Sequence, residues 1–91
     1  MVCEYTDAST SALVNPVTKD FDRNLASRLG IDPSIFGNIS YPGTQVGLLK
    51  PEIASVTGLG QVPVIAVAGH DTASTIAAVP AADGNFAYLS S

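Results

Sequence analysis

Residues 62–80, VPVIAVAGHDTASTIAAVP, decide the expected fold class. Residues 62–68 form an apolar run bounded by turn residues, which is typical of a strand buried on both faces, and Pro63 is tolerated because it lies at the start of the run. The small residues 72–79 predict a helix that lies close on a sheet. In an open α/β sheet, ligands bind just beyond the carboxyl ends of such strands, so we expect the chemistry at His70 and Asp71.

The composition indicates part of a larger α/β domain. The chain has 91 residues, of which 46% are hydrophobic and 13% charged. An average soluble domain has roughly 25% charged residues, so much of this surface is expected to be covered by other structure. The net charge is −4, and the four basic residues are scattered along the chain. Nucleic-acid binding needs a basic stripe, so the sequence argues against a nucleic-acid partner.

The lone cysteine, Cys3, excludes an internal disulfide. One Cys and one His cannot build a zinc site, so no metal-ligating residue is assigned. Cysteine usage of this kind favours a reducing cytosol, and we expect a cytoplasmic protein. No apolar segment approaches the ~20 residues of a membrane span and no leader-like segment opens the chain, so no membrane partner is expected.

Short elements are expected along the rest of the chain. Capping residues, prolines and glycines predict a short helical turn capped by Thr6 or Asp7, a helix over 20–29, a turn over 33–36, a turn at 41–43, an edge strand over 46–49, a helix over 51–56 and a strand over 86–89. Gly58 and Gly60 precede a strand rather than follow one, so they are not expected to bind phosphate.

Asp71 has two interpretations from the residues alone. It could cap the following helix, its carboxylate accepting a backbone N–H, with His70 as a partly buried neighbour. Alternatively it is a general base, since an ionised aspartate can take the proton of a hydroxyl as that oxygen attacks an electrophile. His70 and Thr72 would then orient a polyol through hydrogen bonds. The spacing does not decide between the two.

Four motifs resemble those of the FGGY carbohydrate kinases, and more narrowly of the rhamnulokinase branch. They are the stretches EYTDAST (residues 4–10), YPGTQVG (41–47), GHDTAS (69–74) and FAYLSS (86–91). The resemblance covers essentially the whole chain, and the His-Asp-Thr-Ala-Ser string is the most specific part.

The resemblance implies a sugar kinase with an actin-like, ribonuclease-H-like ATPase fold. Residues 1–91 would be a fragment from the carboxyl-terminal part of its first domain, lacking the phosphate hairpin, the Gly-Thr loop that contacts ATP and the second domain. The parent would transfer the γ-phosphoryl group of ATP, as its Mg²⁺ complex, to O1 of L-rhamnulose. Asp71 matches the proton acceptor, His70 and Thr72 match substrate-contacting neighbours, and residues 6–10 match a mainly structural motif near the sugar. No residue of the fragment is assigned to the cofactor.

Two alternatives remain open at this point. One is another FGGY kinase, acting on fuculose, xylulose or glycerol. The other is a non-catalytic actin-like module that folds only in association with a partner. In either kinase case the partner is the rest of the parent chain, and the isolated fragment is expected to be inactive. Its sheet edges and apolar faces predict self-association.

Overall fold

A computed structural model describes residues 2–90. Eleven short elements follow one another in the described part of the chain: β1 (Cys3–Glu4), α1 (Tyr5–Ser9), β2 (Val14–Asn15), β3 (Asp20–Phe21), α2 (Arg23–Arg28), the 3-10 turn η1 (Pro33–Ile35), β4 (Ile39–Ser40), β5 (Gln45–Leu48), α3 (Pro51–Thr57), β6 (Pro63–Ile65) and α4 (Asp71–Ala77). Short helices and strands are mixed along the chain, as in a small α/β unit.

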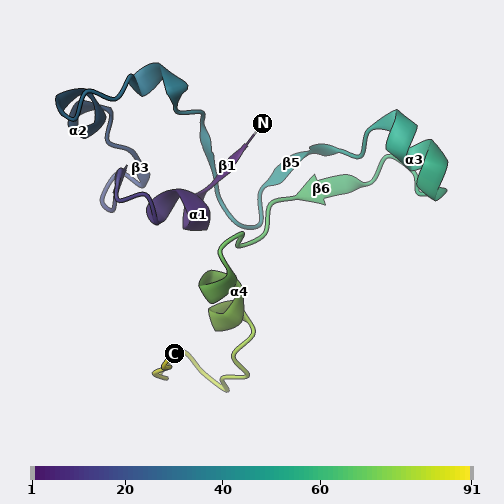
Figure 1. Ribbon diagram of the computed structural model, residues 1–91. Coiled ribbons are helices and arrows are strands. Elements are labelled where there is room, and N and C mark those ends of the chain that lie inside the picture. Colours follow the sequence, from purple (N-terminus) through teal and green to yellow (C-terminus); the bar gives the residue numbers. More distant parts are fainter. Residues whose placement is uncertain (1, 91) are drawn as a thin grey trace.

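The strands pair two by two in three separate sheets. β1 and β4 are parallel, whereas β2 with β3 and β5 with β6 are antiparallel. Figure 1 shows that these units spread as three arms: the segment from β1 to β4, the β5–α3–β6 hairpin, and α4 with the carboxyl-terminal tail. The parallel β1–β4 pair lies near the point where the arms meet.

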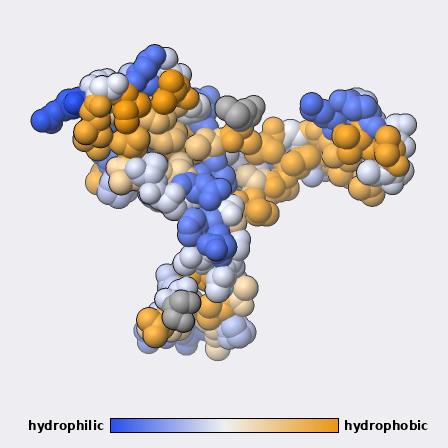
Figure 2. Space-filling model, in the orientation of Figure 1, coloured by the Kyte–Doolittle hydropathy of each residue, from blue (hydrophilic) through white to orange (hydrophobic). Residues whose placement is uncertain are grey.

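The arms leave little room for a core. The radius of gyration is 16.9 Å, whereas a compact domain of this length has one of about 12 Å. The buried apolar residues of the described chain are three alanines, Ala8, Ala26 and Ala54. Apolar side chains lie instead on the surface of the arms, as the space-filling view shows (Figure 2).

The strand in the apolar run is exposed, so the expectation of a strand buried on both faces is wrong. β6 covers only Pro63–Ile65 and pairs with β5 alone. Its Val64 and Ile65 are 39% and 46% exposed. An apolar run indicates that a strand packs against other structure. In residues 2–90, however, no second layer covers this strand.

Local signals placed several other elements well. Pro33 begins η1 with Asp32 as its cap, and Pro51 begins α3. Gly30 follows α2 with a left-handed φ of +75°, the conformation that glycine adopts readily at helix ends. The largest differences lie at two places: residues 20 and 21 form β3, so α2 begins later than expected, and residues 86–89 form no strand.

Candidate functional site

The stretch from Gly69 to Thr72 connects β6 to α4. His70 is extended, with φ −71° and ψ 131°, and is the N-cap of α4. Its Nδ1 lies 3.3 Å from the Thr72 backbone nitrogen, whose N–H it accepts. The interpretation that Asp71 caps this helix is therefore wrong, because the helix begins one residue earlier than that role requires. Asp71 occupies the first helical position.

The Asp71 side chain points to solvent, with 94% of it exposed. Its Oδ1 accepts the Thr72 backbone N–H at 2.6 Å and lies 3.3 Å from His70 Nδ1. The Thr72 N–H is therefore shared, with its shorter bond to Asp71. A carboxylate in this setting is solvated and reachable by a ligand, as a general base must be.

A second segment, the β1–α1 junction, holds the backbone just before Asp71. Glu4 Oε2 accepts the Gly69 backbone N–H at 2.9 Å. The Thr6 hydroxyl oxygen accepts the next backbone N–H, that of His70, at 3.0 Å. The structure thus joins two motifs that are more than sixty residues apart.

Glu4 also caps α1, so the expected cap at Thr6 or Asp7 is wrong. Its carboxylate accepts the backbone N–H groups of Thr6 at 3.0 Å and Asp7 at 3.4 Å, and the Thr6 hydroxyl proton. Desolvation raises the pKa of Glu4, but the hydrogen bonds from Thr6, Gly69 and Asp7 outweigh it and hold that pKa below its ordinary value. Sequence reasoning included Glu4 in a motif without assigning it a role.

Gly69 permits the close approach of the two segments. A Cβ at this position would lie 2.8 Å from Asp7 Oδ2 and 3.2 Å from Glu4 Oε2. Both separations are shorter than ordinary van der Waals contact. The absence of a side chain at Gly69 is therefore what lets the Glu4 carboxylate reach the backbone.

An open pocket of about 310 Å³ lies between α1 and α4. Its lining is mostly small and hydroxyl-bearing: Thr6, Ser9, Thr10, His70, Thr72, Ala73 and Ile76. Two of the three predicted site residues, His70 and Thr72, thus share one surface with the 6–10 motif. Asp71 does not line this pocket and stands beside it on the exposed start of α4.

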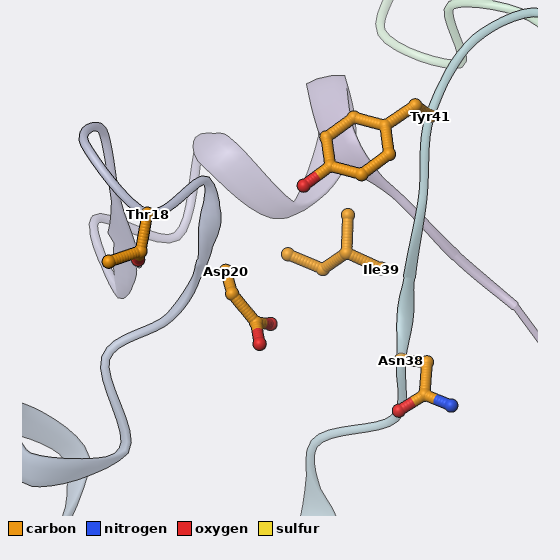
Figure 3. A pocket seen from close by; sticks show the side chains of 5 residues that line it. All are labelled: Thr18, Asp20, Asn38, Ile39 and Tyr41. Atoms are coloured by element: carbon orange, nitrogen blue, oxygen red, sulfur yellow. The ribbon is translucent and has the colours of Figure 1, made fainter.

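A second hollow lies between the β2–β3 hairpin and β4 (Figure 3). Thr18, Asp20, Asn38, Ile39 and Tyr41 line its volume of about 270 Å³. Asp20 supplies the one carboxylate there, and its Oδ1 accepts the backbone N–H of Phe21. None of the predicted site residues contributes to it.

The described residues show neither a metal cluster nor a membrane-spanning helix. Within 2–90, no three His, Cys, Asp or Glu side chains lie together in a way that could hold a metal ion. Over the same residues, every helix is too short or too polar to cross a membrane. Cys3 is a partly buried free thiol.

Comparison with known proteins identifies the relatives of this chain. Residues 1–78 match the model of the FGGY family of carbohydrate kinases, N-terminal domain. Rhamnulokinase of Bacteroides thetaiotaomicron is 54% identical over all 91 residues. Rhamnulokinases of Mannheimia succiniciproducens and Enterobacter sp. are 44% and 43% identical over 88 residues, 97% of the chain.

The chain spans less than a fifth of the length of these relatives. It covers 19% of the Bacteroides protein, 16% of the Mannheimia protein and 17% of the Enterobacter protein. The family match ends at residue 78, so it contains both segments of the site and leaves out the tail that follows α4.

Proposed function

We propose that this chain, which belongs to the FGGY family of carbohydrate kinases, is the part of a rhamnulokinase that supplies the general base, Asp71. The full-length protein would phosphorylate O1 of L-rhamnulose. The observation that carries the proposal is the meeting of the two family motifs, residues 4–10 and 69–72, around an exposed carboxylate.

In the proposed reaction Asp71 accepts one proton. As O1 of the sugar forms a bond to the γ-phosphorus of ATP, the bond from that phosphorus to the β–γ bridging oxygen breaks and ADP leaves. The O1 proton passes to the Asp71 carboxylate. Phosphoryl transfer depends mainly on positioning and on electrostatic stabilisation, and an aspartate beside the attacking hydroxyl fits that demand.

His70 and Thr72 would bind the sugar. Both line the pocket beside Asp71, together with hydroxyl groups from α1. Hydroxyl and imidazole groups can pair with sugar hydroxyls, and such pairing is what distinguishes one polyol from another. The names of the relatives favour rhamnulose over fuculose, xylulose or glycerol as the substrate.

The rest of the machinery belongs to the proposal for the full-length kinase. Magnesium-bound ATP would supply the phosphoryl group, and we assign no residue of this chain to the nucleotide or the metal. Residues 1–91 would be a piece of the amino-terminal domain of an actin-like, ribonuclease-H-like fold.

The test is Asp71→Asn in the full-length protein that contains these residues. Asparagine keeps the shape of the side chain but cannot accept the proton, so we expect kcat with L-rhamnulose to fall ~10²–10⁴-fold. Asp83→Asn is the matched control, because that exposed carboxylate caps only a local turn through Asn85. A coupled assay with each of the four sugars would identify the substrate. Wild-type turnover by Asp71→Asn would refute the base assignment.

The isolated 91-residue chain is proposed to be inactive. Ordering a residue costs roughly 1–2 kcal/mol of backbone entropy, and three buried alanines cannot offset that cost over the whole chain. The exposed apolar arms would also make the isolated chain self-associate. Rhamnulose phosphorylation by the purified fragment, or a monomer by light scattering, would contradict these two expectations.

A further inference from the structure

We propose that Glu4 is a positioning residue: its carboxylate, with the Thr6 hydroxyl, fixes the backbone of Gly69 and His70 so that Asp71 is presented to the sugar in one orientation. The inference rests on the proposed function of Asp71. It assigns a catalytic consequence to a residue that contacts neither sugar nor nucleotide in the proposed reaction.

The first argument is how the Glu4 carboxylate divides its hydrogen bonds. A carboxylate has about four acceptor sites, and four donors surround this one. Three of them come from Thr6 and Asp7, and the two backbone N–H groups among these cap α1. The fourth, the Gly69 N–H at 2.9 Å, serves no helix end, because α4 begins two residues later. Capping α1 therefore does not account for it.

The second argument is the orientation of the Thr6 hydroxyl. Its single proton is donated to Glu4 Oε2, so its lone pairs are free to accept the N–H of His70 at 3.0 Å. Glu4 thus acts on His70 through Thr6 as well as on Gly69 directly. Two consecutive backbone N–H groups held in this way fix the peptide planes that lead into Asp71.

The third argument is that the position of Asp71 depends on the backbone that precedes it. The Asp71 side chain is almost fully exposed, so it is held by its hydrogen bond from the Thr72 N–H rather than by packing. Its position depends on where the backbone at Gly69 and His70 starts the helix. In active sites a ~1 Å misplacement of a reacting group can cost ~10²-fold in rate.

The test is Glu4→Asp in the full-length protein. Aspartate keeps the charge and is a preferred N-cap residue, so α1 stays capped. It is one methylene shorter and no longer spans to the Gly69 N–H. We expect kcat to fall about 10–100-fold, with KM for the sugar and the thermal unfolding midpoint close to wild type. Wild-type kcat would overturn the proposal.

A double-mutant cycle separates positioning from a purely structural role. If Glu4 acts through Asp71, Glu4→Asp costs less than about twofold when Asp71 is already asparagine. Equal losses in both backgrounds would overturn the proposal. Wild-type activity of Asp71→Asn alone would instead show that the proposed function is wrong, so the two failures are distinguishable.

Two further variants complete the experiment. Thr6→Val keeps the β-branched shape and removes the oxygen that accepts the His70 N–H, so it is also expected to lower kcat; it answers the question if Glu4→Asp does not fold. An unchanged kcat would count against the link through Thr6.

Asp32→Asn is the control, because it removes a carboxylate with only local partners. It is expected to leave kcat unchanged. A fall in kcat as large as that of Glu4→Asp would overturn the assignment of a special role to Glu4.

Discussion

Glu4 and Asp32 make nearly the same local contacts at two different helix starts. Each accepts the backbone N–H and the hydroxyl proton of the residue two positions on, Thr6 for Glu4 and Ser34 for Asp32. Only Glu4 reaches a partner far along the chain, the Gly69 N–H. The comparison teaches that one capping arrangement either ends at its own turn or ties distant segments together. The deciding factor is which backbone lies within reach.

Beyond the Glu4 variants, the largest effect that could break this comparison is expected for Gly69→Ala. The exposed Asp7 side chain can rotate away from the added Cβ, whereas Glu4 is held by four donors and must give way. We therefore expect the bond from Glu4 to the backbone to lengthen and kcat of the full-length protein to fall about tenfold. Steady-state kinetics on rhamnulose measures this.

Gly60→Ala is the control for this variant. A Cβ there would meet nothing within 4 Å, and Gly60 has no positive φ, so activity should be unchanged. Combining Gly69→Ala with Glu4→Asp should cost little more than the larger of the two single changes, because both act on one hydrogen bond. Full additivity would mean that Gly69 matters for another reason.

A smaller effect, on how the stability of the fold depends on pH, would sharpen the comparison. Desolvation raises the pKa of Glu4 and its hydrogen bonds lower it by more, so that pKa lies below the ordinary 4.5. The backbone and side-chain hydrogen bonds from Ser34 likewise hold the pKa of Asp32 below its ordinary 3.8. A depressed carboxyl pKa stabilises the fold above the ordinary value, and this contribution is lost as pH falls through the folded-state value.

The measurement compares Glu4→Gln and Asp32→Asn with wild type by thermal unfolding of the full-length protein. Both variants should unfold at lower temperature than wild type near neutral pH. The gap for Glu4→Gln should start to close below pH 4.5, and that for Asp32→Asn only below pH 3.8. A gap that grows as the pH falls would contradict this sign.

The smallest effect is expected for Ser34→Ala. Removing this hydroxyl deletes one exposed bond to Asp32 and leaves the backbone N–H of residue 34 as a donor. The unfolding midpoint of the full-length protein should shift slightly and kcat not at all. A change in kcat comparable to that of Thr6→Val would show that the two turns are equivalent after all.

Local chemistry explains which elements the sequence predicted correctly. The caps and starts at Asp32, Pro33 and Pro51 depend on residues within one turn of each other, so the pattern contains the whole cause. The His70 cap was missed because Asp is preferred over His at such positions. Backbone dihedrals decide the matter, and His70 is the last extended residue before α4.

The wider arrangement depends on partners that no local pattern specifies. The apolar character of residues 62–68 predicted a strand but not its single neighbour, β5. The motifs containing His70 and Asp71 were recognised, yet their contact with Glu4 and Thr6 joins residues 65 and 64 positions apart. A hydrogen bond between a carboxylate and a distant backbone N–H leaves no periodicity to detect.

The 65-residue separation between Glu4 and Gly69 has a consequence during synthesis. A ribosome adds about 5–20 residues per second, so the carboxylate waits roughly 3–13 s before its distant partner exists. Meanwhile α1 is already capped by local donors, and the unused acceptor faces water. When Gly69 emerges, closing this long loop costs only slightly more entropy than closing one half its length, because the cost grows with the logarithm of loop size. The bond between Glu4 and Gly69 can therefore form late in synthesis, although Glu4 is among the first residues made.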